Sequence, residues 1–244
     1  MKLVLLGTGG YYPTPHRQTA CVMLPEIGVV LDAGTGMYRL GDYLQTDHLD
    51  IFLTHAHLDH IAGLTYLINI LPPEVLAQTT IHGEAAKLNA VQDHLFADAI
   101  FPVAPTFKFK PLDGPRALHP TGRLTYFPLA HPGGSIGFRL DWPDRSLAYV
   151  TDTTATTNSP YADAIRGVDL LLHEAYFADD SQNMAAKTGH SALSAVALLA
   201  SEVQPRQLVL VHLDPVRDID AEVQLMKQVF PNMCLAKDGE EFEF

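Results

Sequence analysis

Short runs of apolar residues recur along the first part of the chain, each bounded by glycine or polar residues. Such runs are typical of buried strands. They read KLVLLG, ACVML, GVVLD and DIFLTH, the last at 50–55. The period then changes, because apolar residues recur at helical spacing from Asp59 to Leu71, where Pro72 and Pro73 end the pattern. The pattern therefore predicts strands followed by one helix over 59–71.

The second half of the chain shows the same mixture of elements. Runs that predict strands are RLTYFPLAH at 123–131, IGFRLDW at 136–142, SLAYVTD at 146–152 and VDLLLHE at 168–174. A helix is expected from about Ser191 to Glu202, then a strand at 207–212, and the closing EEFEF alternates as an edge strand does. This mixture predicts an α/β fold with two sheets sandwiched between helices. No linker-like stretch divides the sequence, so we expect a single domain, 1–244.

Composition and charge narrow the classes of partner. The chain has 244 residues and is 47% hydrophobic, which is enough for a large core. Its net charge is −12, and its 16 Lys and Arg residues form no basic run, which disfavours a long nucleic acid without excluding it. Bound divalent metals would reverse the local charge. Such a protein could therefore still attract a small anionic substrate.

The sequence contains no pattern that predicts export or a membrane span. The apolar run in MKLVLLGTGG is too short for a signal peptide, and ALSAVALLA at 192–200 has the length of a core helix. Two cysteines, Cys21 and Cys234, are too few for a disulfide framework or a cysteine-built zinc site. We therefore expect a cytoplasmic protein with reduced thiols and no membrane partner.

A histidine or an aspartate stands where several predicted strands end. These residues are His55, His131, Asp152, His173 and His212. A single histidine at a strand end is more often structural than a metal ligand. Their convergence on one sheet edge favours metal binding instead.

The motif HAHLDH at 55–60 is the densest group of potential ligands. His55 and His57 are two apart on an extended segment and can point to the same side, and Asp59 and His60 follow as the chain turns into the helix. Two imidazoles can serve one metal while the carboxylate and the third imidazole serve a neighbouring one. Neutral imidazole and carboxylate oxygen suit zinc, and also manganese or iron, so the spacing leaves the metal open.

Together with LGTGG and LDAGTG before it, the H-x-H-x-D-H motif resembles that of the metallo-β-lactamase superfamily. Later segments resemble the branch that contains ribonuclease Z and the small cyclic phosphodiesterases. They are LAHPGGSIGFRL around His131, YVTDT around Asp152, LLHEAYF around His173, TGHSA around His190 and LVLVH ending at His212. The resemblance spans nearly the whole chain and implies a four-layer αββα sandwich with a dinuclear metal site at one sheet edge.

The resemblance also implies a ligand set. It assigns His55, His57 and His131 to one metal, and Asp59, His60 and His212 to the other. Asp152 would bridge the two divalent ions, most simply Zn²⁺, with Mn²⁺ or Fe²⁺ as alternatives. Asp32 at the end of GVVLD either orients the histidine loop or only shapes the turn before Gly34.

Candidate catalytic residues follow from the same resemblance. A metal-bound hydroxide would attack the phosphorus of a phosphodiester, and Asp59 would orient or deprotonate the water. His190 occupies the position of a catalytic histidine in the ribonuclease Z pattern and would protonate the leaving oxygen. Glu174 would hold or tune His190, whereas His173 is more simply a packing or supporting residue.

Departures from the ribonuclease Z pattern bear on the substrate. Ribonuclease Z enzymes carry a long arm that clamps transfer RNA, inserted between the positions that match His131 and Asp152; here that interval suffices only for two strands and a turn. The loop after the first glycines, YYPTPHRQTAC, is also altered, and its Tyr11 and Tyr12 either stack a base or cover the core. We therefore expect a small or cyclic phosphodiester as substrate.

Three alternatives stay open. They are ribonuclease Z-type processing of transfer RNA 3′ ends without the arm, thioester or lactone hydrolysis on the same metals, and non-catalytic metal-dependent binding of a metabolite. The HEA and GHS segments match the phosphodiester branch better than the thioester or lactone hydrolases. A homodimer also stays open, since relatives are often dimeric but no surface stripe marks an interface.

Overall fold

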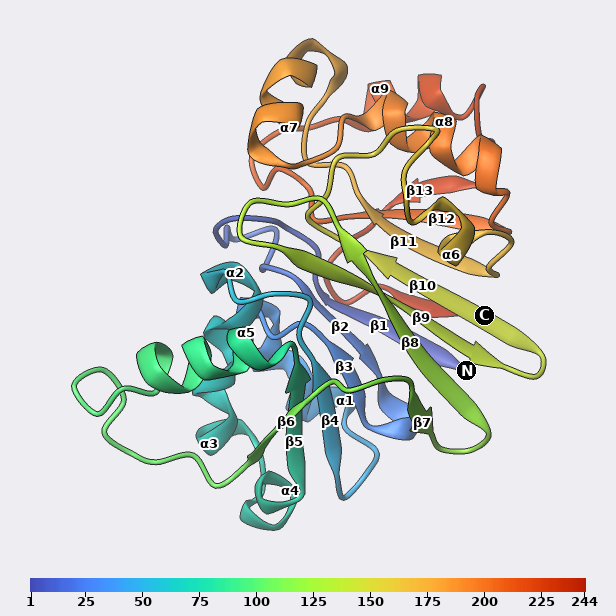
Figure 1. The fold of residues 1–244 in the computed structure, drawn as a ribbon. Helices are drawn as coiled ribbons and strands as arrows, with labels where there is room; N and C mark the ends of the chain where they lie inside the picture. Colours follow the sequence, from blue (N-terminus) through green and yellow to red (C-terminus); the bar gives the residue numbers. More distant parts are fainter. The chain divides into compact units, whose positions relative to one another are not determined.

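The computed structural model describes all residues from Met1 to Phe244 and divides them into two compact units. The first unit comprises Met1–Gly114 and Lys237–Glu243, and the second comprises Pro115–Ala236 and Phe244. Each unit contains one seven-stranded sheet with its own helices and its own apolar core (Figure 1). The predicted α/β class with two sheets is confirmed. That the whole chain forms a single domain stays a prediction.

The sheet of the first unit has the strand order β14-β1-β2-β3-β4-β5-β6. Its strands are β1 Lys2–Gly7, β2 Cys21–Leu24, β3 Val29–Leu31, β4 Leu49–Phe52, β5 Thr79–Gly83, β6 Lys108–Pro111 and β14 Glu241–Glu243. β14, β1, β2 and β3 pair antiparallel, and β3 to β6 pair parallel. The closing segment is thus the edge strand that its alternation predicts. The opposite edge strand, β6, carries Lys108 and Lys110 exposed, and such charges discourage pairing with another chain.

The helices of the first unit are all short. They are the 3-10 helices Pro25–Ile27, Thr35–Arg39 and Ala62–Tyr66, the α-helices α1 Leu40–Tyr43, α2 Leu58–Ile61, α3 Leu67–Ile70, α4 Pro73–Ala77 and α5 Ala85–Ala90, and a π-helical turn Val91–Leu95. Apolar side chains from these helices pack with Leu6, Met23 and Ile51 of the sheet in one buried cluster. The burial of this cluster stabilises helices that would be too short to form alone.

The helix predicted over 59–71 is interrupted in the structure. α2 and α3 are separated by the 3-10 helix Ala62–Tyr66. The backbone N–H of Gly63 donates to the carbonyl oxygen of Ala33 at 2.7 Å, so a neighbouring loop takes this amide. A Cβ atom on Gly63 would lie 2.2 Å from the carbonyl oxygen of Gly34. The close approach of two backbones therefore breaks the helical period, and apolar spacing alone does not reveal it.

The sheet of the second unit has the strand order β13-β12-β11-β10-β9-β8-β7. Its strands are β7 Arg116–Leu118, β8 Gly122–Leu129, β9 Ser135–Trp142, β10 Arg145–Val150, β11 Leu170–Glu174, β12 Gln207–Val211 and β13 Met233–Leu235. β7 to β10 pair antiparallel, and β10 to β13 pair parallel. β8, β10, β11 and β12 therefore run in the same direction and end at the same edge of the sheet.

The second unit has longer helices, which cover its sheet with apolar faces. Its helices are α6 Ala162–Ile165, the 3-10 helix Asp179–Ser181, α7 Gln182–Thr188, α8 Leu193–Val203 and α9 Asp220–Met226. α8 forms nearly where it is predicted, and its buried Leu193, Val196 and Leu199 pack into the core of this unit. None of the helices in the structure is both long and apolar enough to cross a membrane.

Replacing Gly63 should test whether the backbone contact fixes the break between α2 and α3. Because the new methyl group of Gly63→Ala would collide with the carbonyl of Gly34, we expect the free energy of unfolding to fall by about 1–3 kcal/mol. Gly41→Ala is the matched control, since a Cβ there meets nothing nearer than the carbonyl of Ile70 at 3.5 Å. Urea denaturation of both variants measures the difference, and equal stabilities would contradict the account.

Candidate metal centre

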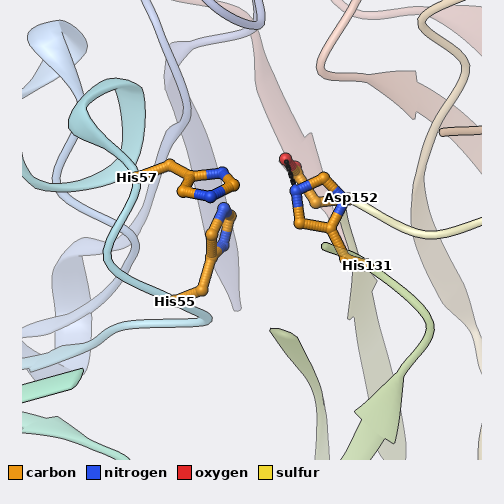
Figure 2. A group of neighbouring side chains, drawn as sticks. All are labelled: His55, His57, His131 and Asp152. Carbon is orange, nitrogen blue, oxygen red and sulfur yellow. Dashed lines mark ion pairs between the residues drawn. The ribbon is translucent and has the colours of Figure 1, made fainter. Parts of the chain in front are cut away.

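The HAHLDH segment of the first unit brings its histidine rings together directly after β4. The ring centroids of His55 and His57 are 4.4 Å apart, and those of His55 and His60 are 4.2 Å apart. Figure 2 draws the His55 and His57 side chains as two neighbouring rings. Oδ2 of Asp59 lies 3.5 Å from Nε2 of His60. All four predicted ligands of this unit are therefore close to one another.

A buried carboxylate, Asp32, holds the HAHLDH segment in place through hydrogen bonds. It follows β3 and accepts hydrogen bonds from the backbone N–H of Thr54 at 2.8 Å and from the Thr54 hydroxyl at 2.9 Å. Nδ1 of His60 donates to Oδ2 of Asp32 at 2.8 Å. A proton on Nδ1 leaves Nε2 as the nitrogen that can bind a metal. Of the two roles predicted for Asp32, the structure supports the orienting one.

In the second unit, three predicted ligands follow the strands that end at one edge of the sheet. His131 follows β8, Asp152 follows β10 and His212 follows β12. Oδ2 of Asp152 lies 3.5 Å from Nε2 of His131, the ion pair dashed in Figure 2. The other oxygen, Oδ1, lies 3.2 Å from Nε2 of His212. Each oxygen of this carboxylate thus faces a different histidine.

Three of the residues at strand ends have a left-handed backbone. The φ angles of Asp32, Asp152 and His212 are 58°, 46° and 48°. Such a conformation costs about 1–3 kcal/mol for a residue other than glycine, and it persists only where the surrounding structure determines it. Residues held in this way cluster at functional sites. Three of the strained positions are therefore two predicted ligands, Asp152 and His212, and the residue that orients His60.

Burial and one hydrogen bond prepare His131 for metal binding. Its Nδ1 donates to the carbonyl oxygen of Gly189 at 2.9 Å, which directs Nε2 towards Asp152. Burial lowers the pKa of His131 from its ordinary value, against the opposing effects of the Gly189 carbonyl and of Asp152. The neutral imidazole that results is the form that binds metals.

Glu174 is fully buried at the end of β11 and holds the segment that contains His190. Its Oε1 accepts from the backbone N–H of Thr153 at 2.7 Å and from Nδ1 of His190 at 3.0 Å. Its Oε2 accepts from the backbone N–H of Ser191 at 3.0 Å. The predicted contact between Glu174 and His190 is therefore present, although the catalytic role of either residue stays a prediction.

The structure also places His190 beside two predicted metal ligands. One potential ligand atom from each of Asp152, His190 and His212 lies within 4.8 Å of the others. The ring of His190 stacks on that of His212, with centroids 5.4 Å apart. In the sequence, only its position in the ribonuclease Z pattern distinguishes His190 from the predicted ligands. The geometry is compatible with His190 as a proton donor and with His190 as a metal ligand.

His173, in contrast, is built into the core of the second unit. Its Nε2 lies 2.9 Å from the hydroxyl of Tyr161, and its Nδ1 donates to the carbonyl oxygen of Glu174 at 2.8 Å. Burial lowers the pKa of His173 and raises the pKa of Tyr161, so both stay neutral. These contacts support the packing role predicted for His173.

Sequence reasoning missed two features around the HAHLDH segment. The backbone N–H of Tyr11 donates to Oδ2 of Asp59 at 2.8 Å, a contact between distant positions that no local pattern indicates. An open cavity of about 340 Å³ lies on the first unit and is lined by Ala56, Leu58, Ile61, Ala90, Val91, His94, Leu95 and Ile100. The alternation within HAHLDH could have indicated this cavity. Ala56 and Leu58 stand between the predicted ligands in sequence, so on an extended segment they are expected to point to the other side.

Comparison with known protein families gives the same assignment as the fold and the clustered residues. The family described as "Beta-lactamase superfamily domain" matches residues 28–213, which is most of the chain. The chain belongs to the beta-lactamase superfamily. The clustered histidine and aspartate side chains of this chain are of the kind that can hold divalent metal ions.

Individual relatives place the chain more closely within the superfamily. It is 26% identical over 270 residues to the Ribonuclease Z of Halobacterium salinarum, an alignment covering 87% of this chain and 86% of that protein. The metallo-β-lactamase fold protein YhfI from Bacillus subtilis is 21% identical, with a TM-score of 0.83 and 99% of each chain covered. A diphosphatase from the PhnP family is 20% identical, with a TM-score of 0.76, covering 100% of this chain and 96% of that one.

These comparisons confirm the metallo-β-lactamase fold and the predicted class. The chain is a hydrolase of the metallo-β-lactamase superfamily and of its ribonuclease Z-like branch.

The contact between Asp32 and His60 predicts a measurable loss of metal affinity. Asp32→Asn removes the carboxylate that fixes the tautomer of His60, and loss of such a partner lowers metal affinity by about 10- to 100-fold. Competition with a zinc-binding dye measures the affinity. The control is Asp42→Asn, which changes an exposed carboxylate of α1. Equal zinc affinity in the two variants would show that Asp32 only shapes its turn.

Proposed function

We propose that this chain is a metal-dependent phosphodiesterase that hydrolyses a small or cyclic phosphodiester with two divalent ions, most simply Zn²⁺. In this proposal His55, His57 and His131 would hold one ion, Asp59, His60 and His212 would hold the other, and Asp152 would be shared by both.

The observation that carries the proposal is the disposition of Asp152. One of its oxygens faces Nε2 of His131 and the other faces Nε2 of His212, as a carboxylate shared by two ions requires. The donor set fits divalent metals of the zinc type, because it consists of imidazole nitrogens and carboxylate oxygens. Buried partners hold several of these donors, which is typical of a functional metal site.

The chain's own residues would position the substrate and move one proton. When bound, the metals would lower the pKa of a water and offset the negative charge of the phosphodiester. Since the carboxylate of Glu174 accepts a hydrogen bond from Nδ1 of His190, transfer of a proton to the leaving oxygen would fall to Nε2 of His190. Asp59 would orient the attacking water through its carboxylate, which the backbone of Tyr11 holds in place.

A small substrate is supported by the segment between His131 and Asp152. β9 and β10 occupy this segment and are joined through Pro143 and Asp144, so the interval is filled by one hairpin. The net charge of −12 also disfavours a long polyanion. A protein of similar fold is described as a diphosphatase from the PhnP family, so in that protein this fold acts on a phosphate compound.

Processing of transfer RNA 3′ ends is the second candidate, favoured by one specific observation. The Halobacterium salinarum relative, which aligns over most of both chains, is named Ribonuclease Z. A precursor transfer RNA would have to bind without the arm of the ribonuclease Z pattern. The same assay separates the two candidates.

Hydrolysis by purified, metal-quantified protein tests the proposed function. A chromogenic phosphodiester, a cyclic nucleotide, a phosphomonoester, a thioester, a lactone and a precursor transfer RNA form the panel. We expect metal-dependent turnover of the small diesters that Asp152→Ala abolishes. Asp144→Ala, in the exposed hairpin turn, is the control and should keep activity. Turnover confined to the transfer RNA, the thioester or the lactone would replace the proposal by that function. Two bound metals without any turnover would indicate a binding protein.

Substitution of His190 separates a proton donor from a metal ligand. As general acid, His190 should contribute about 10²- to 10⁴-fold to the hydrolysis of a diester with an alkoxide leaving group. His190→Ala should lose most of this rate, keep its metal content, and lose far less with p-nitrophenolate, which needs no proton to leave. Rates on the two diesters and elemental analysis provide the readouts. An equal loss on both diesters together with loss of metal would identify His190 as a ligand instead.

A further inference from the structure

We propose that Tyr11 and Tyr12 form a stacking surface for a planar ring of the substrate, so that the phosphodiester carries a nucleobase or a similar aromatic group beside its phosphate. This inference rests on the proposed function, because it takes Asp59 as part of the reaction centre. It names a substrate class and two residues that determine specificity.

The exposure of the two tyrosines rules out the view that they cover the core. Tyr11 is 76% exposed and Tyr12 is 42% exposed. Their ring centroids are 5.9 Å apart and the ring planes meet at 79°. The pair therefore offers aromatic faces to a ligand instead of packing under the sheet. Large exposed aromatic groups of this kind are typical of binding surfaces.

A hydrogen bond places this aromatic pair next to a proposed metal ligand. The backbone N–H of Tyr11 donates to Oδ2 of Asp59 at 2.8 Å. The Tyr11 residue, whose Cα carries the ring, is therefore in direct contact with the carboxylate of Asp59. A phosphodiester bound at the metal that Asp59 would hold would carry its organic group towards the two rings.

The backbone at Tyr11 is strained in a way that a solvated loop does not need. Its φ angle is 66°, in the left-handed region that bulky residues avoid. Glycine would adopt this conformation at little cost, and Gly9 and Gly10 stand directly before it. A tyrosine in this position indicates that the ring itself is used.

The loop that carries the pair is closed and fixed at its base. The backbone N–H of Gly9 donates to the carbonyl of Gln18, and that of Gln18 donates to Oδ2 of Asp238 at 2.6 Å. The guanidinium of Arg17 donates to the hydroxyl of Thr8, which in turn donates to Asp238. Because the loop is ordered in advance, stacking of a ring would cost little additional conformational entropy.

Two cyclic phosphates of the same ring size provide the kinetic test. Adenosine 2′,3′-cyclic phosphate carries a base, and glycerol 1,2-cyclic phosphate carries none. Stacking on one aromatic side chain strengthens binding by about tenfold or more. We therefore expect Tyr11→Ala to lower the ratio of kcat/KM for the adenosine ester to that for the glycerol ester by about tenfold, mainly through KM. Tyr11→Phe should restore the ratio, and Tyr12→Ala should lower it less.

Tyr38→Ala is the matched control, because Tyr38 is 52% exposed on the same unit and lies under the guanidinium of Arg39. It should leave the ratio of the two substrates unchanged. A ratio that Tyr11→Ala does not change would overturn the proposal while leaving the diesterase function intact.

A binding measurement tests the same surface without turnover. Isothermal titration calorimetry compares adenosine 5′-monophosphate with inorganic phosphate on the metal-loaded protein. Wild type should prefer the nucleotide, and Tyr11→Ala should lose about tenfold of that preference. This result in a protein that hydrolyses neither diester would reject the proposed function and keep the stacking surface. Equal preference in wild type and Tyr11→Ala would reject the surface.

Discussion

Two carboxylates with no exposure to solvent, Asp32 and Glu174, determine how the candidate centre is built. A buried carboxylate is costly unless donors surround it, and removing one donor leaves a charge without compensation. Asp32 is surrounded by Thr54 and His60, and Glu174 by backbone N–H groups and His190. In each unit, hydrogen bonds thus hold a loop that follows a strand against a buried charge.

The need to satisfy these two buried carboxylates accounts for the orientation of the groups around them. His60 and His190 each use Nδ1 to satisfy a buried carboxylate, which leaves the other ring nitrogen, Nε2, for chemistry. The left-handed backbones of Asp152 and His212 are tolerated at the ends of β10 and β12 because the parallel sheet fixes both strands. Strain and buried charge are therefore concentrated at these strand ends, and each unit has its own apolar core.

Much of this could be predicted from the sequence because strand runs and the HAHLDH spacing are local signals. The edge strand β14, helix α8 and the strand-end positions of His131, Asp152 and His212 all follow from such patterns. The break at Gly63 could not be predicted, since it depends on a backbone contact with Ala33. The same holds for the contact of Tyr11 with Asp59 and for the exposure of Tyr11, which the sequence left undecided between stacking and core packing.

The central claim is that the clustered histidine and aspartate side chains bind two metal ions, and metal counting tests it most directly. The proposal assigns His57 and His131 to the same ion, and the two stand in one group of potential ligands. Elemental analysis of wild type, His57→Ala, His131→Ala and the double variant should give two zinc ions per chain in wild type. Each single variant should retain one ion, and the double variant should also retain one. Loss of both ions in the double variant but only one in each single variant would show that the two histidines bind separate metals.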